Sequence, residues 1–250
     1  MANAAGVLPQ LKNLTQLERT AYHQPSETNK LAVLAQRQQV LGHLQLVAAA
    51  IASTAAELDC EGERADQVAG YLAEQENQRV QRLTVLSIGV GAVAGIGTTV
   101  FDQKALQYTF GIGGGLLTAG LGLLSLTSHH KITFEHPRNL LTAVWQEEAS
   151  SALYPPSVWY CLHDKAFSNR GETSVAHNTR QRWEHYGQLA QPNSPEGQRQ
   201  QTLLFGTGGV YSVDELRIRA NMLNELQAAV RLINQDLQAL LLALIPPTAP

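Results

Sequence analysis

The chain has 250 residues and a formal net charge of −3, and 16% of its residues are charged, whereas about 25% is typical. Its hydrophobic content of 44% is enough for one large domain or two small ones with a sizeable core. The sequence has no basic stripe interleaved with aromatic side chains, which argues against nucleic acid as a partner.

Two cysteines, Cys60 and Cys161, show neither CxxC spacing nor a metal-ligand cluster. They are either unrelated thiols or one disulfide, which would imply an oxidising compartment. Residues 1–20 lack the apolar stretch of a secretory signal, so an exported protein would already have lost its leader peptide.

Residues 1–25 predict a short helix and a linker. Four leucines share one helix face, namely Leu8, Leu11, Leu14 and Leu17. Pro25 interrupts this pattern. Ser26 and Glu27 then provide an N-cap and an acidic first turn for the next helix.

Residues 26–82 predict a long amphipathic helix, because strong helix formers dominate and no proline follows Pro25. Two apolar rows recur every seven residues: Leu41, Ala48, Ala55, Gly62 and Ala69, and Leu44, Ile51, Leu58, Ala65 and Leu72. This period is that of a coiled coil. Gly62 is the expected position of a bend or a break.

Residues 83–128 predict a hydrophobic helical hairpin. Residues 83–101 and 105–128 contain no charged side chain, and only Asp102, Gln103 and Lys104 separate them. A membrane-spanning helix needs about 20 mostly apolar residues, so both segments are long enough. Arg79 and Arg82 precede the hairpin. Lys131 and Arg138 follow it, which places both ends on the cytoplasmic side by the positive-inside rule.

Small residues recur at four-residue intervals in both arms, as in helices that pack closely within membranes. The first arm has the row Ser87, Gly91, Gly95 and Thr99. The second arm has the rows Gly111, Gly115 and Ala119, and Gly114, Thr118 and Gly122. We interpret these rows as glycine zippers. A buried hairpin in a soluble protein and a pair of glycine-rich strands remain open, although interior glycine costs a helix about 1 kcal/mol relative to alanine.

Residues 129–211 predict an irregular helical region. We expect a helix over 138–152 and a short aromatic helix around Trp159 and Tyr160. Residues 168–178 and 191–200 read as polar loops, and the glycines of 206–209 as a flexible turn. We expect the core of this region to be aromatic. Its members would be Trp145, Trp159, Tyr160, Trp183 and Tyr186.

Residues 212–250 predict a C-terminal heptad helix and a tail. Ser212 and Glu215 match the capping box. The heptad rows are Leu216, Leu223, Val230, Leu237 and Leu244, and Leu226, Ile233 and Leu240. Pro246 and Pro247 end the helix.

The sequence contains histidines, carboxylates and cysteines of the kinds found in catalytic and metal sites, but their spacing does not predict that they lie close together. His129, His130 and His136 lack the partners of a metal site, and we interpret them as polar residues at a membrane interface. Glu147, Glu148 and Asp164 read as solvated carboxylates, and Cys161 and His163 point to different helix faces. The glycines of 206–209 lack the spacing of a phosphate-binding loop. We therefore expect no enzyme, no metal and no cofactor.

The sequence thus predicts an all-α protein in which coiled-coil-like helices bear a glycine-zipper hairpin. The expected function is a membrane-anchored scaffold or interaction protein, with membrane lipids and partner helices or further copies as partners. Its layout resembles that of α-helical pore-forming toxins, which store a hydrophobic hairpin on a helical bundle. This resemblance of organisation implies the alternative of a membrane-inserting protein with a concealed hairpin.

Overall fold

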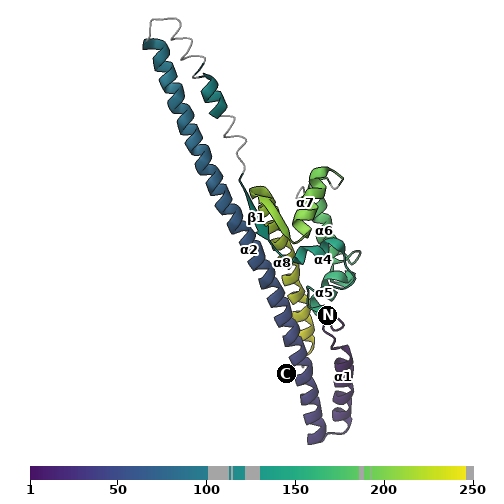
Figure 1. Ribbon diagram of the computed structural model, residues 1–250. Coiled ribbons are helices and arrows are strands. Elements are labelled where there is room, and N and C mark those ends of the chain that lie inside the picture. Colours follow the sequence, from purple (N-terminus) through teal and green to yellow (C-terminus); the bar gives the residue numbers. More distant parts are fainter. Residues whose placement is uncertain (101–112, 114, 122–129, 186–188, 192, 246–250) are drawn as a thin grey trace. The chain divides into compact units, whose positions relative to one another are not determined.

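A computed structural model describes residues 1–100, 113, 115–121, 130–185, 189–191 and 193–245 (Figure 1). The described chain is mostly helical, as predicted, with a two-stranded sheet that the sequence analysis did not anticipate. The chain divides into two compact units. Unit 1 comprises residues 1–64, 135–208 and 218–250, and unit 2 comprises residues 65–134 and 209–217.

The helix α2 runs without interruption from Glu27 to Val100. Ser26 caps its start, because the Ser26 hydroxyl accepts a hydrogen bond from the Asn29 amide at 3.2 Å. No proline interrupts it, and the helix is not broken at Gly62. The first arm of the predicted hairpin is therefore the continuation of the long amphipathic helix.

In unit 1, the helix α1 (Leu8–His23) lies along the first turns of α2. The Arg37 guanidinium is paired with the Glu18 carboxylate at 2.6 Å. The Asn13 amide donates a hydrogen bond to Gln36 at 2.9 Å. Leu14 is the buried member of the predicted leucine face, so this helix is held by both polar and apolar contacts.

The buried residues of α2 lie mainly on one face. Every member of one predicted apolar row is buried, namely Leu44, Ile51, Leu58, Ala65 and Leu72. In unit 1 this face meets the helix α8 (Val213–Ala243). A Cβ atom added to Gly62 would lie 3.6 Å from the carbonyl oxygen of Ala220 and 3.5 Å from the Cβ of Leu223. Gly62 thus marks a close approach of two helices.

Four short helices complete unit 1, with a one-turn 3₁₀ helix, η1 (Lys165–Phe167), between the second and third. They are α4 (Leu140–Gln146), α5 (Pro156–His163), α6 (Val175–His185) and α7 (Pro195–Phe205). Their core is aromatic as expected, since Trp159 and Trp183 are buried and Trp145 stacks on Phe205 with 4.3 Å between ring centroids. Tyr160 is exposed, and Tyr186 lies outside the described residues.

Four predictions for this region were wrong in detail. The polar loop expected over 168–178 ends where α6 begins at Val175. The helix expected over 138–152 ends at Gln146. Residues 195–205 form α7 instead of a loop, because Ser194 caps a helix that begins with a proline, which fits the first helical position. The turn expected at 206–209 leads directly into a strand, β2 (Gly208–Ser212).

The strand β2 pairs with β1 (Lys131–Glu135) in the two-stranded sheet. In unit 2 the rings of Phe134 and Tyr211 meet edge to face with 5.8 Å between centroids, and both are buried. The predicted capping box of α8 is present, since the Ser212 amide donates to the Glu215 carboxylate at 2.8 Å and the Glu215 amide donates to the Ser212 hydroxyl at 3.4 Å.

Candidate functional site

The first arm of the predicted hairpin presents an apolar surface in unit 2. None of the residues from 73 to 96 is buried. Large apolar side chains stand exposed along the arm, with Ile88 66% and Val93 63% exposed. The other large apolar residues of this arm that are exposed are Val85, Leu86 and Ile96. Such continuous exposure is unusual in a soluble protomer and marks a surface that something else covers.

One side of this arm is less exposed than the rest. Leu83, Ser87, Val90 and Ala94 are half-buried, and their spacing of four, three and four residues places them on one face. Gly91 lies beside this face, where a Cβ would stand 3.9 Å from the Thr118 hydroxyl of the second arm. The structure therefore brings together Gly91 and Thr118, two residues of the predicted small-residue rows.

The second arm is helical over residues 115–121. Leu116 and Leu117 are exposed, as are Gly115 and Ala119 of one predicted row. Gly95 is also exposed, and only the backbone of Thr99 is described. The predicted residues Gly111, Gly114 and Gly122 lie outside the described residues.

By length and composition, α2 contains an 18-residue window that is apolar enough to cross a membrane. In this window 33% of the residues are buried. Because no residue from 73 to 96 is buried, the window includes the amphipathic part of α2 before residue 73. A core helix of a soluble protein and a signal sequence pass the same test. The feature specific to the hairpin is the exposure of the apolar side chains of residues 83–96.

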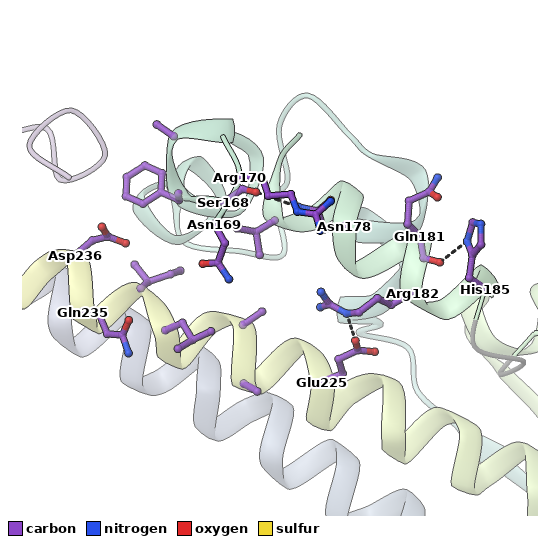
Figure 2. A pocket seen from close by; sticks show the side chains of 17 residues that line it. Ser168, Asn169, Arg170, Asn178, Gln181, Arg182, His185, Glu225, Gln235 and Asp236 are labelled. Carbon is purple, nitrogen blue, oxygen red and sulfur yellow. Dashed lines mark hydrogen bonds and ion pairs between the residues drawn. The ribbon is translucent and has the colours of Figure 1, made fainter. Parts of the chain in front are cut away.

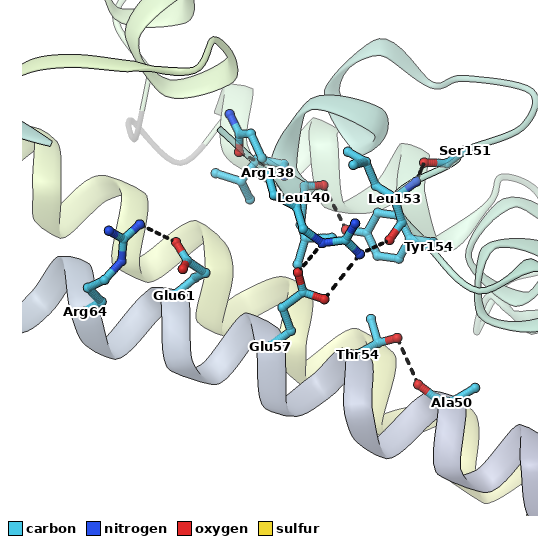
Figure 3. Close-up of polar contacts among 12 residues, drawn as sticks. Ala50, Thr54, Glu57, Glu61, Arg64, Arg138, Leu140, Ser151, Leu153 and Tyr154 are labelled. Carbon is cyan, nitrogen blue, oxygen red and sulfur yellow. Dashed lines mark hydrogen bonds and ion pairs between the residues drawn. The ribbon is translucent and has the colours of Figure 1, made fainter. Parts of the chain in front are cut away.

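The four flanking cations differ in their surroundings. Arg79, Arg82 and Lys131 are exposed at the two ends of the hairpin. Arg138 lies in unit 1, where its guanidinium pairs with the Glu57 carboxylate and donates to the Leu153 carbonyl at 2.6 Å (Figure 3). The Arg138 side chain thus contacts both α2 and the loop before α5.

The three histidines predicted at the interface do not form a group. His130 donates its backbone amide to the Glu76 carboxylate at 2.7 Å, and His129 lies outside the described residues. His136 is buried, contrary to the expected interfacial position. Burial, together with the nearby Arg219 guanidinium, lowers the pKa of His136 to about 4. His136 and Arg219 are far apart in the sequence, so no local pattern indicates this environment.

A broad groove of about 1280 Å³ separates α6 from α8 in unit 1 (Figure 2). Four polar side chains of α6 line it: Asn178, Gln181, Arg182 and His185. The opposite wall is α8, with the exposed side chain of Leu232. Arg182 pairs with Glu225 across the groove. This pairing leaves the groove without a dominant charge, and the sequence analysis missed it because its walls are distant in sequence.

The remaining candidates for chemistry have structural roles. Cys60 and Cys161 are free thiols, Cys60 exposed and Cys161 buried, so the possible disulfide is not formed. Burial raises the pKa of Cys161 to about 12. Glu147 pairs with His177 and Arg180, and Asp164 caps η1. Among the described residues no group of three or more metal-ligating side chains occurs.

Comparisons of the chain with protein-family models, with curated proteins and with solved structures found no match.

Proposed function

We propose that the protein is a membrane-anchored helical protein that inserts through the hairpin of residues 83–128 and offers its helical body to partner helices or to further copies. The observation that carries the proposal is the exposed apolar surface of residues 83–96 on an uncharged stretch of chain. A lipid bilayer removes such a surface from water, at about 25 cal/mol for each Å².

The exposure also favours a permanent anchor over the toxin-like alternative. A hairpin that is stored inside a soluble fold would be covered by the rest of the chain. The described residues of both arms are instead exposed or half-buried. Exposed apolar residues near the end of α8, Leu242 and Ile245, support the expectation of partner helices.

The anchor is tested with two matched pairs of substitutions on the same helix. Ile88→Lys with Val93→Lys alters the apolar arm, and Leu31→Lys with Leu34→Lys alters residues of similar exposure, 64% and 60%, near the start of α2. All four side chains are exposed, so neither pair disturbs a core. A lysine at the centre of a membrane helix costs about 3 kcal/mol.

The readout is the fraction of full-length protein that stays with membranes after an alkaline carbonate wash. We expect the wild type and the Leu31/Leu34 variant to remain with the membranes, and the Ile88/Val93 variant to be released. A wild type that is wholly soluble, or two variants that are released equally, would contradict the proposal. Dye release from liposomes by a soluble wild-type monomer would favour the toxin-like alternative.

A further inference from the structure

A groove lies in unit 2 where the polar part of α2 meets the apolar arm. It has a volume of about 550 Å³, and its described lining consists of Gln78, Gln81, Arg82, Val85 and Leu86. The spacing of these residues places them along one side of the helix. Polar side chains thus line one end of the groove, and apolar side chains line the end one helical turn further along.

We propose that this groove binds an anionic phospholipid. The guanidinium of Arg82 contacts the headgroup phosphate, and the acyl chain lies along Val85 and Leu86. The inference rests on the proposed function, because it requires the hairpin to stand in a bilayer. An arginine at the end of a membrane helix extends to the headgroup layer, and its planar fork matches a phosphate.

The local charges favour an anionic lipid over a neutral one. Arg79, Arg82 and Lys131 are exposed, and neither arginine makes an ion pair within the described part of the chain. Two carboxylates that precede these arginines on α2 accept hydrogen bonds from neutral donors. Glu74 accepts from the Gln78 amide at 3.0 Å, and Glu76 accepts from the His130 backbone amide at 2.7 Å.

Arg82 is thus an exposed cation in the lining of the groove, and Arg79 is a second exposed cation one helical turn away. Each basic residue near an anionic membrane surface strengthens binding by about fivefold. Arg79 and Arg82 together would therefore give a preference for anionic over neutral lipid of about 25-fold. The apolar end of the groove adds the requirement for an acyl chain, which distinguishes a lipid from free phosphate.

The experiment uses the full-length protein in detergent micelles, with native mass spectrometry to count bound ligands. The probes are phosphatidylserine, phosphatidylcholine and inorganic phosphate, each added separately. Arg82→Gln removes the proposed phosphate contact. Arg231→Gln is the matched control, because Arg231 is also exposed and makes no ion pair within the described residues. Flotation of the same proteins with vesicles tests the anchor independently.

We expect wild type and the Arg231 variant to retain phosphatidylserine in preference to phosphatidylcholine, and Arg82→Gln to reduce that preference about fivefold. Equal retention of the two lipids by the wild type, or equal losses in both variants, would overturn the inference while flotation still supports the anchor. Retention of inorganic phosphate as strong as that of phosphatidylserine would replace the lipid with a free anion. A wild type that does not float would overturn the anchor and this inference together.

Discussion

Asn139 and Arg219 meet inside unit 1, with 3.2 Å between the Nη1 atom of Arg219 and the Oδ1 atom of Asn139. The same Oδ1 accepts the Leu141 amide and so caps α4. The Asn139 amide donates to the carbonyl oxygens of Leu204 and Gly206, each at 2.8 Å. One buried side chain therefore joins the start of α4, the end of α7 and the helix α8.

Replacing Asn139 by alanine should destabilise the protein by about 3 kcal/mol. The lost cap accounts for about 1 kcal/mol, and buried groups left without partners account for about 2 kcal/mol. Urea unfolding followed by circular dichroism in detergent micelles measures the change. Asn169→Ala, at an exposed position, is the control. A loss for Asn139→Ala no larger than that of the control would refute the role of this network.

The buried imidazole of His136 should make the stability depend on pH. Its pKa is lowered from 6.5 to about 4 by burial and by the charges of Arg219 and Arg64. Between these two values the unfolded chain binds a proton that the folded chain does not. The stability is therefore retained above about pH 6.5 and falls as the pH drops towards 4, by about 3 kcal/mol.

Urea unfolding at a series of pH values checks this dependence. We expect His136→Gln to flatten the fall between about pH 6.5 and pH 4. His185→Gln, at an exposed position, should leave it unchanged. The same slope in wild type and His136→Gln would show that other groups cause the fall.

Substitutions at Gly62 should reveal the close approach of α2 and α8. A Cβ there would lie 2.7 Å from the Asn224 side-chain oxygen, which stands at the exposed end of a flexible side chain and can rotate away. Gly62→Ala should therefore be tolerated, whereas Gly62→Leu should cost about 2 kcal/mol by forcing the helices apart.

Gly42 on the same helix provides the comparison, because nothing lies within 4 Å of a Cβ built there. Gly42→Ala should raise the free energy of unfolding by about 1 kcal/mol through helix propensity alone. Gly42→Leu should cause no loss. Thermal unfolding of the four variants separates the contact from the propensity, and equal behaviour of the two leucine variants would contradict the close approach.

A cysteine pair should test the contact between the hairpin arms. In a background of Cys60→Ser and Cys161→Ala, Gly91→Cys with Thr118→Cys should form an intrachain disulfide on mild oxidation. The 3.9 Å between a Cβ at Gly91 and the Thr118 hydroxyl oxygen is within reach of such a bond after a small shift. Mass spectrometry detects the loss of two hydrogens.

The control replaces Thr118→Cys with Ala119→Cys, since Ala119 is exposed on the neighbouring side of the helix. This pair should cross-link more slowly. If the Gly91→Cys/Ala119→Cys pair formed a disulfide rapidly and the 91–118 pair did not, the arms would meet through the row that contains Ala119.

The features that sequence analysis recovered depend on local rules. The Ser26 cap and the Ser212–Glu215 capping box involve residues three apart, so the sequence displays both partners together. The apolar face of α2 recurs within each heptad. A signal for α7 was also present, as Ser194 followed by Pro195, but the polar composition of 191–200 obscured it.

The features that sequence analysis missed depend on distant partners. The strand β1 has an alternation of Ile132 and Phe134, too short to identify without its partner β2. The burial of His136 and Arg219 follows from packing between segments far apart in the chain. The residues that line the groove between α6 and α8 are also far apart in the sequence, so only the packing of the two helices brings them together.

The pairing of β1 with β2 has a consequence for how the chain folds. It joins the residues that follow the hairpin to the residues that precede α8, across the whole stretch that contains α4 to α7. Closing so long a loop costs chain entropy before the paired strands return any stability. Helical hydrogen bonds are local, and short peptide helices form within about a microsecond. We therefore expect the sheet to form after the helices, and during synthesis β2 must leave the ribosome before β1 can pair with it.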